Sequence, residues 1–277
     1  MEYAEFSYAN ADHPRLKRWI IRGVEGLSGR KKLLRLYEIW RDQIVGSTPY
    51  QWGGLLNLIN VSLSVSGSTW PPKQMPDGPL VVIANHPFGI GDGLAMLALC
   101  EQLDRPYRIL INNELLKVPE IRPYSLPVDF EETAEALRNN MRTRQEALRL
   151  LKEGVTIIVF PGGGVATAKK PFGRAEELPW KTFTAKLIRS AQATVLPVFF
   201  EGQNSPLFHM ASRLSLTLRL SLLIREFRRI VGSRISVRVG EAIPFEELST
   251  FGNQKEVIDH LHERVHALAP PELRRSA

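Results

Sequence analysis

Two residues in a short glycine-rich stretch have the chemistry of an acid–base pair. The stretch 81–93 reads VVIANHPFGIGDG and places His86 and Asp92 six positions apart, directly after a run of strand-forming residues. If the carboxylate bonds one imidazole nitrogen, it fixes the tautomer and leaves the other nitrogen to accept a proton. His86 is therefore a candidate general base and Asp92 the residue that orients it. The alternative is that Asp92 only caps the following helix and His86 is a loop histidine.

The sequence offers no protein nucleophile to accompany this pair. No G-x-S-x-G motif is present, so the nucleophile turn of an α/β-hydrolase is not indicated. Cys100, the only cysteine, lies in the apolar helical pattern LAMLALCEQL, and we expect it to be a core residue. A histidine base without a nucleophile favours activation of the substrate's own hydroxyl or amine, which means direct transfer of a group to an acceptor.

Two other predicted strands also end in turns rich in glycine and polar residues. FPGGGVAT follows an apolar run at 155–160, and FEGQNS ends a second run at 194–202. The backbone amides of Gly162, Gly163 and Gly164 could hold a phosphate or an oxyanion, although a plain strand-to-helix turn explains them equally well. Neither a Walker loop nor a dinucleotide fingerprint is matched. Because ligands gather at the carboxyl ends of strands in open α/β sheets, the three turns together indicate one site.

The elements that must bring these turns together follow from the hydrophobic pattern. From residue 80 onward, short apolar runs alternate with amphipathic helical segments. This alternation predicts an α/β fold with a mixed, largely parallel sheet flanked by helices and preceded by an N-terminal helical segment. Strands are expected at 61–67, 80–85, 105–112, 155–160, 194–202 and 234–243, and helices at 13–46, 93–103, 131–154, 179–192 and 254–268.

A proline-rich connector divides the chain into two parts. Residues 69–79 read TWPPKQMPDGP, a composition typical of turns. We place a boundary there, with an N-terminal helical segment at 1–75 and an α/β domain that carries the site at 76–277.

The charge and the amphipathic segments favour an anionic partner. The formal net charge is +7, which attracts nucleic acid, anionic headgroups or phosphate-bearing molecules. Segments 13–46 and 208–234 combine arginine and lysine with large apolar side chains, so they can lie on a membrane or pack a core with solvated charges outside. No signature of a nucleic-acid-binding fold, signal peptide or membrane-spanning stretch is present. We therefore expect a peripheral protein on the cytoplasmic face of an anionic membrane, with no nucleic-acid partner.

A second motif, HERVH, lies near the C-terminus. It matches H-E-x-x-H, the helical zinc motif, and its spacing puts His262 and His266 on one helix face. Few residues follow before two prolines end the helix, which leaves little room for a third ligand, although Glu272 or a residue upstream could supply one. Surface helices often carry histidine and glutamate together, so we assign no metal site here.

The three glycine-rich turns carry a resemblance to a known family. NHPFGIGDG, then FPGGGVAT, then VLPVFFEGQNS resemble, in order and spacing, the lysophospholipid/glycerolipid acyltransferase superfamily, in particular its bacterial hemolysin-like or ornithine-lipid-type branch. The resemblance covers about residues 75–245. It implies a helical N-terminal part and an αβ catalytic domain on the membrane surface.

The resemblance also implies an activity and a set of site residues. The activity is acyl transfer from a thioester on coenzyme A or acyl carrier protein to the hydroxyl of a lysolipid, with the thioester as co-substrate and no other cofactor. His86 matches the general base of the family, and Asp92 matches its partner. The residues expected to bind substrate or the oxyanion are Asn85, Phe160, Pro161, Gly162, Gly163, Gly164, Gly202 and Asn204.

Two departures from the family pattern bear on the substrate. The usual motif is H-x4-D, with four residues between the histidine and the aspartate. Here five residues separate His86 and Asp92, a spacing that is familiar in the branch named above. The usual F-P-E-G-T-R-S motif has an acid and an arginine that serve a phosphate-bearing acceptor, whereas the turn here has Gly162 at the place of the acid and no arginine. A lyso-aminolipid or another lysolipid is thereby favoured over glycerol 3-phosphate or lysophosphatidate. The alternatives are a lipid-binding protein of the same fold without activity and a zinc hydrolase at His262 and His266.

Overall fold

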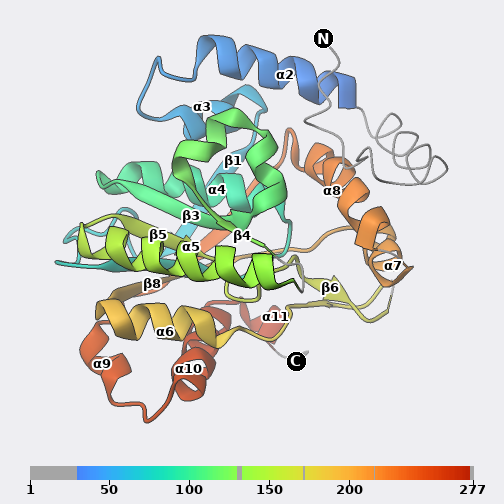
Figure 1. Cartoon of the computed structure of the whole chain (residues 1–277). Coiled ribbons are helices and arrows are strands. Elements are labelled where there is room, and N and C mark those ends of the chain that lie inside the picture. Colours follow the sequence, from blue (N-terminus) through green and yellow to red (C-terminus); the bar gives the residue numbers. More distant parts are fainter. Residues whose placement is uncertain (1–29, 130–132, 171, 215, 275–277) are drawn as a thin grey trace.

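The computed structural model describes residues 30–129, 133–170, 172–214 and 216–274 (Figure 1). A seven-stranded sheet with the order β1-β9-β8-β2-β5-β3-β4 forms its centre. Five neighbouring strands from β8 to β4 run parallel, whereas β9 is antiparallel to β8 and β1 is parallel to β9. The strands are β1 Ser62–Gly67, β2 Leu80–Ala84, β3 Tyr107–Asn112, β4 Ser125–Val128, β5 Thr156–Val159, β8 Thr194–Phe200 and β9 Arg234–Val239.

Helices cover both faces of this sheet, and β2 shows why. All five residues of β2 are buried, and successive side chains point to opposite faces. Leu80, Val82 and Ala84 join one hydrophobic cluster, whereas Val81 and Ile83 join another. The first cluster is closed by α2 Arg30–Gln43, α3 Gln51–Leu58, α4 Ile90–Cys100 and the end of α8 Leu216–Ile230. The second is closed by α5 Ala134–Lys152, α6 Thr182–Ala191, α9 Phe245–Ser249 and α10 Gln254–His266.

The remaining elements are short. The segments η2, η3 and η4 are 3₁₀ helices on either side of β3, and α11 lies near the C-terminal end. A two-stranded antiparallel hairpin, β6–β7, stands apart from the main sheet and precedes α6. The bounds are η2 Glu101–Leu103, η3 Asn113–Lys117, η4 Pro119–Tyr124, β6 Thr167–Ala168, β7 Ala175–Glu176, α7 Pro206–Leu214 and α11 Pro271–Arg274.

The predicted fold class, a mixed and largely parallel sheet flanked by helices, is confirmed. Three details differ from the pattern-based expectation. The edge strand β4 and the hairpin β6–β7 were not predicted, and the segment 208–234 divides into α7 and α8 before β9 begins. The described part of the helix predicted at 131–154 begins at Ala134, where the hydroxyl of Thr133 accepts a hydrogen bond from the backbone N–H of Ala136. The first part of the helix predicted at 13–46 lies outside the described residues.

The N-terminal segment is built into the same structure as the sheet. Strand β1, which comes before the proline-rich connector, pairs with β9 over six residues. Trp40 and Trp52 pack 5.2 Å apart between ring centroids and belong to the same hydrophobic cluster as β2. Among the described helices, none combines the length and the hydrophobicity that a membrane crossing requires.

We expect Trp40→Ala to lower the free energy of unfolding of the whole molecule by about 3–5 kcal/mol, because it removes a large buried side chain. Trp40 is 2% exposed, and its indole N–H donates to the carbonyl of Gln51. Urea unfolding followed by circular dichroism should show one cooperative transition with a lower midpoint. Leu137→Ala is the control, since Leu137 is 64% exposed. A separate early transition that leaves the main one unchanged would mean that the N-terminal helices form their own unit.

Candidate active site

The structure brings His86 and Asp92 together at the carboxyl end of β2. The imidazole Nδ1 lies 2.9 Å from Asp92 Oδ1. Asp92 is completely buried in the first turn of α4, whereas the His86 side chain keeps 17% of its surface exposed. The buried partner therefore faces one ring nitrogen, and solvent or a substrate can reach the ring.

The contact is short but not linear. Its angles fall outside those of a regular hydrogen bond, and neither His86 Nδ1 nor Asp92 Oδ1 has another hydrogen-bond partner among the described residues. Two buried polar atoms without competing partners gain from a small rotation that aligns them. Catalytic hydrogen bonds are often misaligned before substrate binds and tighten in the complex.

The loop between the two residues closes through one backbone hydrogen bond and two close packing contacts. The second carboxylate oxygen of Asp92 accepts from the backbone N–H of Phe88 at 2.8 Å. Gly89 has a φ of +83°, and a Cβ there would come within 3.0 Å of Val165 and Leu223. The ring of Phe88 occupies the space where a side chain at Gly202 would lie. The extra residue between His86 and Asp92 is thus accommodated by a tight turn that depends on glycine.

The second glycine-rich turn lies directly against the histidine. The ring of Phe160 stacks on the imidazole of His86 with 4.2 Å between centroids, and the backbone N–H of Ala166 donates to the carbonyl of His86. The amide of Gly163 donates to the carbonyl of Phe160 and so closes the turn itself. The prediction of an oxyanion site in this turn therefore rests on the amides of Gly162 and Gly164.

The third turn is joined to the first by side-chain bonds to the backbone. The buried amide group of Asn85 donates to the carbonyl of Phe200 at 2.9 Å and accepts from the N–H of the same residue at 2.6 Å. The paired ends of β2 and β8 are thereby fixed. Asn204 is 3% exposed, and its side-chain nitrogen has no hydrogen-bond partner among the described residues. Asn204 therefore keeps an unused donor beside the site, and that atom is shielded from solvent.

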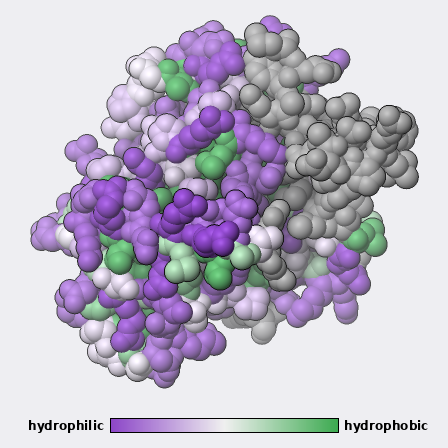
Figure 2. All heavy atoms as spheres, in the orientation of Figure 1, coloured by the Kyte–Doolittle hydropathy of each residue, from purple (hydrophilic) through white to green (hydrophobic). Residues whose placement is uncertain are grey.

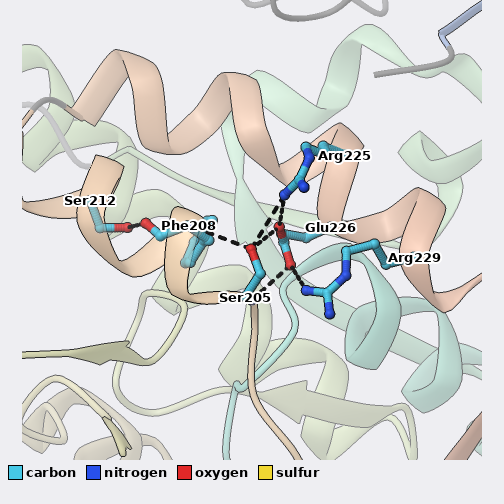
Figure 3. Close-up of polar contacts among 6 residues, drawn as sticks. All are labelled: Ser205, Phe208, Ser212, Arg225, Glu226 and Arg229. Carbon is cyan, nitrogen blue, oxygen red and sulfur yellow. Dashed lines mark hydrogen bonds and ion pairs between the residues drawn. The ribbon is translucent and has the colours of Figure 1, made fainter. Parts of the chain in front are cut away.

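A buried carboxylate anchors the far end of the third turn (Figure 3). Glu226 of α8 accepts from both the backbone N–H and the hydroxyl of Ser205, at 2.8 and 2.6 Å. Arg225 and Arg229 pair with the same carboxylate at 3.1 and 2.9 Å. The hydroxyl of Ser205 also accepts from the N–H of Phe208 in the first turn of α7. The turn is therefore held between two helices, and the buried negative charge is balanced by two cations.

Sequence reasoning missed one residue that contacts the site directly. Glu177, in the loop after β7, accepts the backbone N–H of His86 at 2.9 Å through Oε1. Its Oε2 accepts from the indole of Trp180 at 3.1 Å and lies 3.0 Å from Nε2 of His266. A Cβ at Gly162 would lie 3.8 Å from Glu177 Oε1, so this carboxylate occupies space beside the glycine turn. No motif surrounds Glu177, and only the folded chain reveals its place.

Two further groups bear on the chemistry that is open to the site, Arg219 of α8 and Cys100 at the C-terminal end of α4. The guanidinium of Arg219, from α8, donates to the carbonyl of Val165 at 2.7 Å, and burial lowers its pKa from the ordinary value. Cys100 is fully buried in α4, and burial, with a smaller contribution from the charge of Glu101, raises the pKa of its thiol. A protonated thiol inside a helix is a poor nucleophile. The arrangement therefore favours base catalysis by a histidine over covalent catalysis by a cysteine.

Comparison with known proteins gives consistent matches. A family model described as acyltransferase matches residues 58–270. Two proteins named lyso-glycine lipid O-acyltransferase are similar. The one from Phocaeicola vulgatus is 25% identical over 187 residues, and the one from Bacteroides thetaiotaomicron is 26% identical over 156. These alignments cover 63% and 56% of this chain but only 63% and 53% of the relatives' lengths.

A solved structure shares the fold. The crystal structure of the 1-acyl-sn-glycerophosphate (LPA) acyltransferase PlsC from Thermotoga maritima superposes with a TM-score of 0.53 at 18% sequence identity. The superposition covers 92% of this chain and 88% of that chain. At this identity the likeness concerns the fold.

We expect Gly202→Ala to lower the free energy of unfolding by about 1–3 kcal/mol, because its φ of +128° strains any other residue and the new Cβ would push Phe88 aside. Gly93→Ala is the matched control. Gly93 lies within α4 with open space around its Cβ position, so that alanine should raise stability by about 0.4–1 kcal/mol. Urea unfolding midpoints measure both changes. Equal midpoints for the two variants would contradict the packing of Phe88 on Gly202.

Proposed function

The chain belongs to the acyltransferase family, and from this premise we propose that it transfers a fatty acyl group from an acyl thioester to the hydroxyl of a lysolipid. The observation that carries the proposal is the pairing of His86 Nδ1 with the buried carboxylate of Asp92 at 2.9 Å. A histidine held in this way is a general base, and Cys100, at the far end of α4, is too deeply buried to act as a nucleophile.

The proposed reaction is one direct transfer. Asp92 holds Nδ1 of His86, so Nε2 accepts the hydroxyl proton while the hydroxyl oxygen attacks the thioester carbonyl. The negative charge that develops on the carbonyl oxygen would be stabilised by the amides of Gly162 and Gly164. The carbon–sulfur bond then breaks, and the imidazolium returns its proton to the thiolate. The products are the acylated lipid and a free thiol.

For the acceptor, we propose a lysolipid with an amino-acid headgroup. The two similar proteins are named for a lyso-glycine lipid. The turn Phe160–Gly164 carries no charged side chain of its own, so it has no dedicated group for a phosphate. The donor is acyl-CoA or acyl carrier protein, both of which present the same thioester.

We expect His86→Ala to lower kcat by about 10²–10⁴-fold, because the proton acceptor is removed. Asp92→Asn should lower kcat by a similar factor, since an amide cannot stabilise the imidazolium. The assay is thin-layer separation of labelled product after purified full chain is mixed with a labelled acyl thioester and a panel of lysolipids. His260→Ala is the control, because His260 pairs with Glu247 on the α9–α10 side of the molecule. Undiminished transfer by both variants would exclude this mechanism, and lysolipid binding without any transfer would indicate a lipid-binding protein.

For the location, we propose that the chain docks on an anionic membrane with the face formed by the β6–β7 hairpin and α7. Nine large hydrophobic side chains are exposed among the described residues, and five of them are in this region. Figure 2 shows hydrophobic surface where α7 lies. The five are Phe172, Leu178, Leu207, Met210 and Leu214.

Hydrogen bonds join the two parts of this face, and β6 begins directly after Ala166, whose N–H donates to the carbonyl of His86. The side chain of Gln203 accepts from the N–H of Ala175 and donates to the carbonyl of Gly173, which ties the hairpin to the start of α7. Lys170 and Arg213 are exposed on the same two elements. Exposed apolar side chains beside lysine and arginine suit insertion among anionic headgroups. A lipid acceptor would then reach His86 without leaving the bilayer surface.

We expect the double variant Phe172→Ser/Leu214→Ser to bind vesicles at least about tenfold more weakly than the wild type, because it removes two side chains that are 89% and 79% exposed. Co-sedimentation with vesicles that contain phosphatidylglycerol measures this, and neutral vesicles test the role of charge. The control is Leu137→Ser/Met141→Ser, which removes two exposed hydrophobic side chains from α5. Equal loss in both double variants would mean that no particular face docks.

A further inference from the structure

The H-E-x-x-H motif of α10 gains a third potential ligand in the folded chain. Glu177, which is 85 residues upstream of His262, lies against this helix. Its side chain and those of His262 and His266 offer ligand atoms that all lie within 4.8 Å of one another. We propose that Glu177, His262 and His266 form a binding site for one divalent transition-metal ion, with Zn²⁺ as the best fit. Two imidazoles and one carboxylate form a ligand set that zinc commonly takes.

The geometry of the three side chains is largely fixed before any ion binds. The rings of His262 and His266 are one helical turn apart, with 4.2 Å between their centroids. The ring of Trp180 packs edge-on against His262 at 5.1 Å, and its N–H donates to Glu177 Oε2. The Glu177 side chain is only 6% exposed. A small closing movement of the imidazoles would therefore suffice to bring three ligand atoms to one ion.

One of the two histidines already contacts the carboxylate that would share the ion. His266 now bonds Glu177 Oε2 directly at 3.0 Å. In the metal-bound state the ion would take the place of that hydrogen bond.

This site would support the loop from His86 to Asp92 rather than perform hydrolysis. Oε1 of Glu177 is already bonded to the backbone N–H of His86 at 2.9 Å, so an ion on Oε2 would fix the carboxylate that holds the proposed base. Glu263, which would have to act as the base of a zinc hydrolase, is exposed to solvent. The ion would thus join α10 to the loop that follows β2. Ligation itself does not depend on the proposed acyl transfer.

The test is direct metal binding by the full chain without a polyhistidine tag. After dialysis against a chelator, titration calorimetry with zinc chloride should show one ion per chain, and the melting temperature should rise when zinc is added. Cobalt, a coloured substitute, should give the intense visible absorption typical of four-coordinate sites. We expect His262→Ala, His266→Ala and Glu177→Gln each to weaken binding by at least roughly tenfold.

His260→Ala, on the same helix, is the control for non-specific zinc binding by surface histidines. This variant should bind zinc like the wild type. His262 and His266 are partly exposed, so their alanine variants should fold, and circular dichroism checks this. Absence of stoichiometric binding to the wild type would overturn the proposal, as would unchanged binding to the double variant His262→Ala/His266→Ala. Because the readout is binding, loss of the metal site and loss of acyl transfer are measured independently.

Discussion

The burial of one carboxylate, that of Asp92, constrains the whole candidate site. A carboxylate removed from water is stable only when its oxygens are bonded or paired. The Phe88 N–H donates to one oxygen of Asp92, Nδ1 of His86 lies 2.9 Å from the other, and the first turn of α4 adds its dipole. To meet these demands the loop must fold back within a few residues, which requires the left-handed backbone at Gly89 and the absence of a side chain at Gly202. Catalytic geometry and local stability therefore depend on the same contacts.

The sequence alone predicted those parts of the structure that depend on residues close together in the chain. Apolar runs predicted β2, β3, β5, β8 and β9, and the amphipathic periodicity predicted the helices between them. Residue types and spacing also singled out His86 and Asp92, and the rule that ligands gather at strand ends predicted that the three turns would meet. The structure shows them in contact, through Phe160 on His86 and Asn85 on Phe200.

The parts that could not be predicted depend on distant pairing. Strand β4 has four residues with a central proline, and β6 and β7 have two each, so none carries a periodic signal. The pairing of β1 with β9 joins segments far apart in the sequence, and the polar, largely exposed sequence of β1 carries no signal for that pairing. Glu177 and Glu226 are ordinary acids in the sequence, and only burial against the loops after β2 and β8 distinguishes them.

The closeness of Gly162 and Glu177 has a consequence for how such chains diverge. A side chain at 162 would meet the backbone of Leu178 at 3.2 Å and the Glu177 carboxylate at 3.8 Å, so the two positions share one small volume. An alanine at 162 therefore needs a small shift of the loop that carries Glu177 and Leu178, and a longer side chain would compete with the Glu177 carboxylate for this space. Loss of Glu177 in turn leaves the His86 N–H without its acceptor. The two positions are expected to covary across homologues, with the effect of either mutation set by the residue present at the other.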